Sequence, residues 1–121
     1  MAEVLLDTDV LVDHLRGARR LRKTADQFAY SVVTRAELYA GRGTDEARVR
    51  VLLAPMREVV VDRTIAERAG ILRRGMRIVM PDALIAATAL ELGIPLVTRN
   101  RRDFQAVPDF RLLDPQDGDS P

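Results

Sequence analysis

Short apolar runs alternate with longer amphipathic stretches along the chain, and this alternation predicts strands between helices. The apolar runs predict strands at residues 4–6, 28–33, 58–61, 94–97 and 110–113. Apolar residues at helical spacing predict helices at residues 10–17, 34–41, 45–54, 63–74 and 82–92, with a further basic helical segment at 16–23. Strands that alternate with helices of this length are typical of an α/β fold. We therefore expect a mainly parallel central sheet of four to five strands, flanked by helices.

The helix predicted at residues 82–92 is the most distinctive of these elements. Between residues 83 and 92 only Thr88 and Glu91 are polar, and Gly93 with Pro95 beyond it supplies the usual stop signals. A helix that is apolar nearly all round is a buried one, yet this one begins with the carboxylate of Asp82. A buried helix headed by an acid marks a candidate site.

Composition narrows the chemistry that such a site can use. A chain of 121 residues that is 47% hydrophobic fits one globular domain. The absence of cysteine excludes disulfides, thiolate nucleophiles and cysteine–zinc sites, and a single histidine, His14, argues against Ser-His-Asp chemistry. No apolar run approaches membrane-spanning length and no signal-peptide pattern opens the chain, so we expect a cytoplasmic protein. Any catalysis would have to rest on carboxylates.

Charge is unevenly distributed along the chain. The formal net charge is +1, but residues 114–121 hold three aspartates and no basic residue, which leaves 19 basic and 15 acidic residues, or +4, for the rest. We expect residues 1–113 to form the domain and residues 114–121 to be a disordered acidic tail. All basic residues except Lys23 are arginine, whose planar fork suits phosphate.

The predicted strands place acids from distant parts of the chain at one edge of the sheet. Asp7 follows the first strand, Glu37 follows the second, and Asp103 follows the strand after the buried helix. In an open parallel sheet, ligands bind outside the carboxyl ends of the strands. Asp82 reaches the same edge if its helix lies beside it. We therefore expect these four acids to converge.

Helix capping is the alternative explanation for each acid taken alone. Asp7 or Asp9 can cap the helix after the first strand, Thr34 and Glu37 are spaced as a capping box, and Asp82 in a first turn complements the helix dipole. Capping does not require that the acids converge, so a shared edge favours a functional site.

Several carboxylates without histidine or cysteine suit hard cations such as Mg²⁺ or Mn²⁺, which support in-line displacement at phosphodiesters. The residue inventory thus predicts metal-dependent hydrolysis of a nucleic acid.

Four blocks of the sequence, in this order, resemble the signature of PIN-domain ribonucleases. They are VLLDTDVLVD at residues 4–13, TRAEL at 34–38, PDALIAATA at 81–89 and LVTRNRRDF at 96–104. Within that family the resemblance is to VapC-type toxins of bacterial toxin–antitoxin pairs, and it runs from residue 4 to residue 113. It implies a PIN-domain fold, Mg²⁺- or Mn²⁺-dependent endoribonuclease activity on RNA, and a cognate antitoxin protein as partner.

The same resemblance implies roles for individual residues. Asp7 and Asp82 match the direct metal ligands, and Glu37 matches a further core acid. Some members have an aspartate where this chain has Asn100, whereas others rely on the acid that matches Asp103. The resemblance therefore leaves two candidates, Asn100 and Asp103, to complete the site through water or a second ion. The catalytic residues implied are Asp7, Glu37, Asp82 and Asp103.

Neighbouring residues in these blocks are expected to support the acids. Those expected to lie around the ligating acids are Thr8, Asp9, Thr98 and Asn100, and the Thr98 hydroxyl is expected to hydrogen-bond a ligating acid. Asp9 stands where many family members have asparagine, which adds a negative charge and is expected to alter metal affinity without abolishing it. Residues expected to bind the RNA backbone are Arg99, Arg101 and Arg102. His14 is expected to be a surface or packing residue.

Two other functions remain open from the sequence. A haloacid-dehalogenase-like phosphohydrolase would use Asp7 as nucleophile and Asp9 beside it, but Leu11 stands where that loop has threonine or valine, and Lys23 comes too early to be its lysine. A non-catalytic domain that binds RNA or a partner is the other alternative.

Apolar residues in the helices at 45–54 and 63–74 exceed what one core needs, so we also expect a two-fold homodimer.

Overall fold

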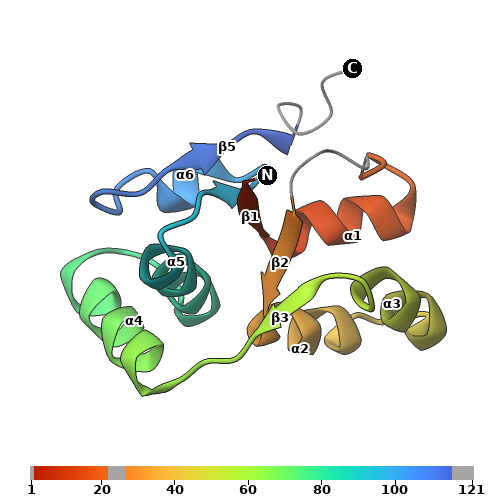
Figure 1. Cartoon of the computed structure of the whole chain (residues 1–121), viewed down its shortest axis with the longest axis horizontal. Coiled ribbons are helices and arrows are strands. Elements are labelled where there is room, and N and C mark those ends of the chain that lie inside the picture. The colour runs from red at the N-terminus through yellow and green to blue at the C-terminus, as the bar shows by residue number, and fades with distance from the viewer. Residues whose placement is uncertain (1, 22–26, 116–121) are drawn as a thin grey trace.

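The structure, a computed structural model, describes residues 2–21 and 27–115 (Figure 1). Its strands are β1 (Glu3–Leu6), β2 (Gln27–Ser31), β3 (Arg57–Val59), β4 (Leu96–Val97) and β5 (Leu112–Leu113). Its helices are α1 (Thr8–Arg16), α2 (Val32–Ala40), α3 (Glu46–Leu53), α4 (Arg63–Gly75), α5 (Met80–Leu92) and α6 (Arg101–Phe104). The strands form one sheet in the order β3-β2-β1-β4-β5, and every neighbouring pair is parallel. The predicted α/β architecture is confirmed.

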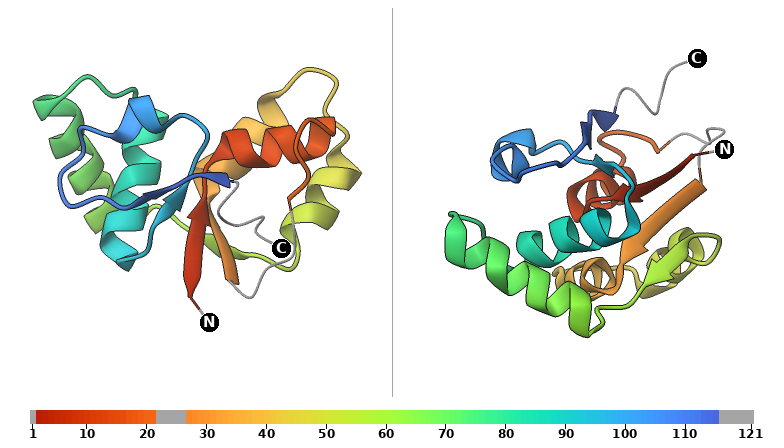
Figure 2. Two further views of the ribbon diagram at one scale, coloured as in Figure 1. Left: turned by 90° about the horizontal axis from the view of Figure 1, so that it is seen from above. Right: turned by 60° about the vertical axis from the view of Figure 1, so that its left-hand side comes forward.

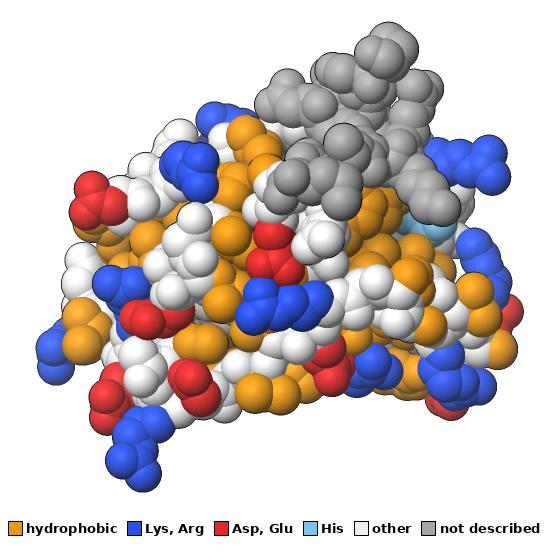
Figure 3. Space-filling model, in the orientation of Figure 1, with side chains coloured by type: hydrophobic (Ala, Val, Ile, Leu, Met, Phe, Trp, Pro, Cys, Tyr) orange, Lys and Arg blue, Asp and Glu red, His pale blue; other side chains and the backbone are white. Residues whose placement is uncertain are grey.

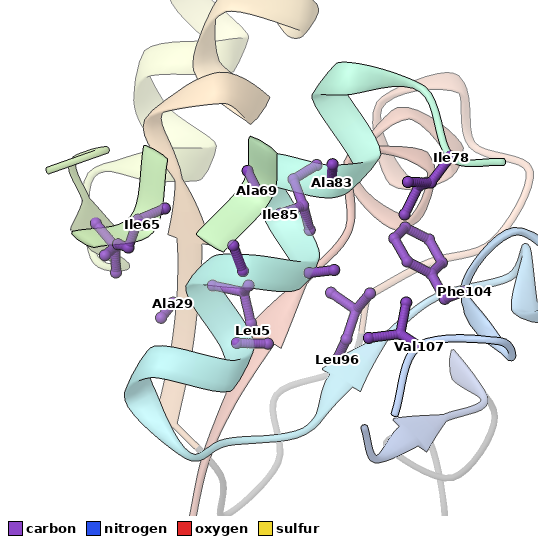
Figure 4. Packing of buried hydrophobic residues seen from close by; sticks show 14 residues of the cluster. Leu5, Ala29, Ile65, Ala69, Ile78, Ala83, Ile85, Leu96, Phe104 and Val107 are labelled. Atoms are coloured by element: carbon purple, nitrogen blue, oxygen red, sulfur yellow. The ribbon is translucent and has the colours of Figure 1, made fainter. Parts of the chain in front are cut away.

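Helices cover both faces of this sheet, because successive side chains of each strand point to opposite sides. Leu5 of β1 packs into a hydrophobic cluster with α4 and α5, whereas Val4 and Leu6 pack into a second cluster with α1, α2 and α3. Figure 4 shows Leu5 and Leu96 of the strands close to α5 in the first cluster. The central strand β1 is thus buried on both sides, which holds its carboxyl end in a fixed place.

Helix α5 is buried as its sequence predicts. Small side chains dominate its buried positions, which are Ala83, Ile85, Ala86, Ala87, Thr88 and Ala89, and they allow close packing against α4. The Thr88 hydroxyl donates to the carbonyl of Leu84 at 2.8 Å, so the one buried polar side chain of the helix interior is satisfied. Gly93 ends the helix at φ 67°, a left-handed conformation that glycine adopts without steric penalty. A rigid, buried α5 fixes Asp82 in its first turn.

The structure corrects several predicted element bounds. The helix predicted at 16–23 is wrong for residues 17–21, because Gly17 at φ 74° ends α1 and the amides of Ala18 and Arg19 bond back to the carbonyl of Asp13; residues 22 and 23 lie outside the described residues. Helix α2 begins at Val32, inside the predicted second strand, and α6 was not predicted. The last two strands have only two residues each.

The outer surface carries both signs of charge. Over the part of the face in Figure 3 that the structure describes, basic and acidic side chains are interspersed with hydrophobic ones, and neither sign dominates. No helix within the described residues is long and apolar enough to cross a membrane. The predicted disordered tail lies outside the described residues from residue 116 onward.

Candidate active site

Asp7 occupies the point where strand order reverses, between β1 and β4. The pairing of Leu6 with Val97 places Asp7 beside Thr98, which directly follows β4. One carboxylate oxygen of Asp7 accepts from the amide of Thr8 at 2.8 Å and so caps α1, and the other accepts from the Thr98 hydroxyl at 2.7 Å. Ligands of open parallel sheets bind at such a reversal, outside the carboxyl ends of the strands. Asp7 is therefore both a helix cap and a candidate ligand.

Burial makes ionised Asp7 unfavourable. Only 5% of Asp7 is exposed. Loss of hydration, with the nearby charge of Asp9 as the next cause, raises the pKa of Asp7 from 3.8 to about 7, against the lowering effect of the bonds from Thr98 and Thr8. A positive charge placed next to this carboxyl group would favour its ionised form and lower its pKa.

A chain of hydroxyl groups leads from Thr34 through Thr8 to Glu37. The Thr8 hydroxyl donates to the Glu37 carboxylate at 2.6 Å and lies 2.9 Å from the Thr34 hydroxyl. Because Thr8 has one hydroxyl proton and gives it to Glu37, Thr34 must be the donor between the two threonines. Thr34 is fully buried on α2. The chain from Thr34 through Thr8 to Glu37 therefore fixes where the Glu37 carboxylate lies.

The capping-box interpretation of Thr34 and Glu37 is wrong. The residue that caps α2 is Ser31, whose hydroxyl accepts from the amide of Val33 at 3.1 Å. Thr34 lies inside the helix and faces Thr8. Sequence reasoning missed this role because the spacing of Thr34 and Glu37 also fits a cap. The preceding serine, Ser31, was the signal for an earlier helix start.

Asp9 has one carboxylate oxygen that is buried and unpaired. Its Oδ2 accepts from the amide of Arg99 at 3.2 Å and lies 3.4 Å from the Thr98 hydroxyl. Its Oδ1 has no hydrogen-bond partner among the described residues. Burial is the largest cause that raises the pKa of Asp9, and the charge of Arg99 opposes it. The Arg99 guanidinium itself pairs with Asp13 at 2.8 Å.

Asp82 shows that acids from several elements converge. Burial first, and then the charges of Asp103, Glu37 and Asp9, raise the pKa of Asp82 from 3.8 to about 6. In the left view of Figure 2, β1 points toward the region between α1 on one side and α5 and α6 on the other. Asp82 is therefore close enough to acids of other elements for their charges to act on it. That the four acids form one functional site stays a prediction.

Two adjoining hollows contain these side chains, and Asp82 lines both. The first, of about 260 Å³, is lined by Asp7, Thr8, Asp9, Val12, Glu37, Asp82, Arg99 and Asn100. The second, of about 340 Å³, contains Asp103. Among the described residues, no group of three or more histidine, cysteine or acidic side chains is arranged so that it could hold a metal ion by itself. Any ion here would take fewer protein ligands and complete its shell with water.

The remaining predicted residues lie around the first hollow or outside it. Asn100 lines the first hollow, and its backbone amide donates to the Thr98 hydroxyl at 3.0 Å. Arg101 donates to the carbonyl of Leu112 at 3.4 Å, and Arg102 is exposed; neither lines the hollow. His14 accepts a bond from the amide of Leu21 at 2.9 Å, which agrees with a packing role.

Comparison with known proteins gives consistent matches over nearly the whole chain. Residues 4–109 match the model of the family described as PIN domain. Ribonuclease VapC10 of Mycobacterium tuberculosis is 40% identical over 124 residues, which cover 93% of this chain and 91% of that protein. A toxin–antitoxin complex from Klebsiella pneumoniae contains a chain that is 31% identical, with a TM-score of 0.74 and coverage of 93% and 97%. VapBC2 from Rickettsia felis, bound to a DNA fragment from its promoter, shares the fold at a TM-score of 0.77 and 21% identity, with coverage of 93% and 98%.

Proposed function

This chain belongs to the PIN-domain family, and from that premise we propose that it is the VapC-type toxin of a toxin–antitoxin pair. Its reaction is endoribonucleolytic cleavage of RNA, assisted by Mg²⁺ or Mn²⁺ at the carboxyl edge of the sheet. The observation that carries the proposal is the hollow into which Asp7, Glu37 and Asp82 project from different elements. The 40% identity to a protein named as a ribonuclease supports the substrate class.

The residues at this edge fit a hard divalent cation. Every candidate ligand offers oxygen, the donor that Mg²⁺ and Mn²⁺ prefer. The unpaired Oδ1 of Asp9 offers a free ligand atom, and the pKa values of Asp7 and Asp82, raised first by burial, are ones that a bound cation would lower. Mg²⁺ usually keeps several waters and takes one or two carboxylates, which agrees with the lack of a three-acid group among the described residues. We assign Asp7 and Asp82 as direct ligands.

Other side chains would act on the waters and on the ligands. Glu37, Asp103 and Asn100 lie where they can contact the ion's waters or hold a second ion. A bound divalent ion lowers the pKa of its water and offsets charge that develops on phosphate oxygens. Thr98 orients Asp7 through its 2.7 Å bond, and Thr8 orients Glu37. Because Asp7 and Asp82 must be ionised to bind a cation, binding should release protons and strengthen as pH rises.

The alternative of a dehalogenase-like phosphohydrolase finds less support. The nucleophile loop of that class needs a lysine further along the chain, and Lys23, the one lysine of the sequence, comes too early. The match to the PIN-domain model also favours a nuclease over that class. A domain that only binds RNA or a partner would have no need of the ordered hydroxyl chain that positions Glu37.

Two partners follow from the proposal. Structural neighbours are toxin–antitoxin complexes, so we propose a cognate antitoxin protein that binds this chain and inhibits it in the cytoplasm. We also propose a homodimer, since Val51 of α3 is 74% exposed and Ile71 of α4 is 59% exposed. Sedimentation of the isolated chain as a monomer at micromolar concentration would contradict the dimer.

The experiment that tests the proposed activity compares two substrates under two metal conditions. Purified protein is incubated with a mixed-sequence single-stranded RNA or with a small phosphomonoester, in chelator or in excess Mg²⁺. The proposal predicts internal RNA cuts with Mg²⁺, none in chelator, and no phosphomonoester hydrolysis in either. Phosphomonoester hydrolysis would favour the phosphohydrolase, and RNA binding without cleavage in Mg²⁺ or Mn²⁺ would favour the binding module.

A further inference from the structure

The second hollow beside Asp82 has a basic side that the proposed reaction leaves unused. We call it the basic hollow; it is lined by Arg73, Arg77, Ile78, Val79, Asp82 and Asp103. Its walls come from the last turn of α4, the connection to α5, the first turn of α5, and α6. Since Asp82 also lines the first hollow, a ligand that lies over Asp82 reaches both.

Its framework is part of the packed core. Ile78 and Phe104 are 5% and 1% exposed and belong to the same hydrophobic cluster. Figure 4 shows Ile78 next to the ring of Phe104, so the α4–α5 connection is fixed against α6. The Arg73 guanidinium donates to the carbonyl of Ile78 at 2.6 Å, which ties the end of α4 to the same connection. The hollow is therefore held by core packing and not by surface side chains alone.

The two arginines have donor capacity to spare. A guanidinium has five N–H donors, and Arg73 uses one on Ile78. Arg77 forms no ion pair or hydrogen bond with any residue that the structure describes. Neither arginine pairs with Asp82 or Asp103, although all four line one hollow. Two guanidinium groups without an ion pair, next to the proposed site of phosphodiester cleavage, favour an anionic ligand.

We propose that Arg73 and Arg77 bind a backbone phosphate of the RNA, adjacent in the strand to the phosphate that is cut. This inference rests on the proposed ribonuclease function, since it places the cut phosphate at Asp7 and Asp82. The fork of arginine donors matches phosphate oxygens in a planar geometry. Arg99 lines the first hollow. The RNA strand therefore runs past Arg99, crosses Asp82 and continues into the basic hollow.

The two acidic residues that line the basic hollow are compatible with phosphate binding when a cation is bound nearby. Asp82 and Asp103 would repel a phosphate in the metal-free protein, but a divalent cation at the first hollow offsets their charge. RNA binding at the basic hollow is therefore expected to be stronger with Mg²⁺ than in chelator. A single-stranded RNA carries one phosphate per nucleotide, which supplies the second anion without any demand on base sequence.

The test uses Arg77→Gln and Arg73→Gln, with Arg74→Gln as the matched control. Arg74 lies in the same last turn of α4 and is exposed, but does not line the hollow. Binding of a labelled single-stranded RNA is measured in Mg²⁺ over a range of salt, with Glu37→Gln in every protein so that the RNA stays intact while Asp7 and Asp82 still hold the ion. Each hollow variant should bind roughly three- to tenfold more weakly, with the slope of log affinity against log salt flatter by about 0.7. The control should match its parent.

A cleavage series separates this inference from the proposed function. In proteins that keep Glu37, Arg77→Gln should lower kcat/KM for an RNA that extends beyond the cut bond on both sides. It should leave cleavage of a dinucleotide that contains only that bond unchanged. The inference is overturned if both variants bind RNA with the affinity and salt slope of their parent while the unmutated protein still cuts RNA. Loss of partner-protein binding in those variants would not change that conclusion. An unmutated protein that cuts no RNA would overturn the proposed function itself.

Discussion

Replacing Asp7 with asparagine should stabilise the metal-free protein at neutral pH, although it removes a side chain that caps α1. The pKa of Asp7 is raised from 3.8 to about 7. Each unit of pKa corresponds to about 1.4 kcal/mol, so ionised Asp7 destabilises the folded state by about 4 kcal/mol once both states are ionised. The residue is 5% exposed, and little of this is lost to solvent screening.

The sign of the pH dependence follows from which state ionises first. Below about pH 4 the carboxyl is protonated in both states, and its ionisation does not affect stability. Between about pH 4 and about pH 7 the unfolded chain ionises while folded Asp7 stays protonated, so stability falls by about 1.4 kcal/mol per pH unit. Above this range the loss is complete. Asp7→Asn removes this contribution, so the difference in stability between variant and parent grows with pH.

Asparagine can satisfy the local hydrogen bonds in one orientation. Its carbonyl oxygen accepts from the amide of Thr8 and continues to cap α1. Its amide then donates to the Thr98 hydroxyl, whose proton can turn to Asp9 Oδ2, which lies 3.4 Å away. This rearrangement reduces the gain, and we expect a net stabilisation of about 2–4 kcal/mol at about pH 8.

Urea unfolding in chelator at a series of pH values measures this effect. The matched control is Asp45→Asn, because Asp45 caps α3 from an exposed position by accepting from the amide of Arg48 at 3.2 Å. That variant should follow the parent at every pH. Added Mg²⁺ should stabilise the parent by mass action and stabilise Asp7→Asn much less. If Asp7→Asn and the parent lose stability in parallel as pH rises, the reasoning about the buried carboxyl is refuted.

Three further outcomes are expected. Thr98→Val removes the donor to Asp7, so the pKa of Asp7 should rise further when followed by NMR, and Mg²⁺ affinity should fall about tenfold. Thr34→Val breaks the hydroxyl chain to Glu37 and should lower kcat more than it raises KM, whereas Thr34→Ser should keep most activity; equal activities of the two would contradict a positioning role. Arg99→Ala should weaken RNA binding and flatten its salt dependence by about 0.7 per lost phosphate contact, and an unchanged slope would assign Arg99 to its ion pair with Asp13 alone.

The alternation of strands and helices, apart from α6 and the helix expected at 16–23, was predictable from the sequence, and so was the place of Asp7 at the end of β1. Burial of α5 follows from its run of small apolar residues, and Gly93 followed by Pro95 gives its end without reference to tertiary structure. The position of Asp7 after an apolar strand was enough to place it at the carboxyl edge, because parallel strands share that edge. These features depend on local sequence and on general rules of sheet topology.

Other features depend on contacts that no local pattern contains. The basic run at 16–23 has helical spacing, but Gly17 at φ 74° ends α1 before it. Thr34 has the spacing of a cap, and its bond to Thr8 becomes visible only when α1 and α2 lie side by side. Arg73 and Arg77 lie outside the four motif blocks, just before the block at 81–89, and the fold of the α4–α5 connection places them beside Asp82.

The central claim is that Asp82 binds a cation, rather than only stabilising the first turn of α5. RNA cleavage in Mg²⁺ by one matched pair of variants tests this claim most directly. Asp62 caps α4 by accepting from the amide of Ile65 at 2.9 Å, and asparagine caps helices about as well as aspartate. Asp62→Asn should therefore cut RNA like the parent, whereas Asp82→Asn should lose cleavage and the stabilisation by Mg²⁺ while remaining folded. A folded Asp82→Asn protein that still cuts RNA at the parent rate and still responds to Mg²⁺ would contradict the account.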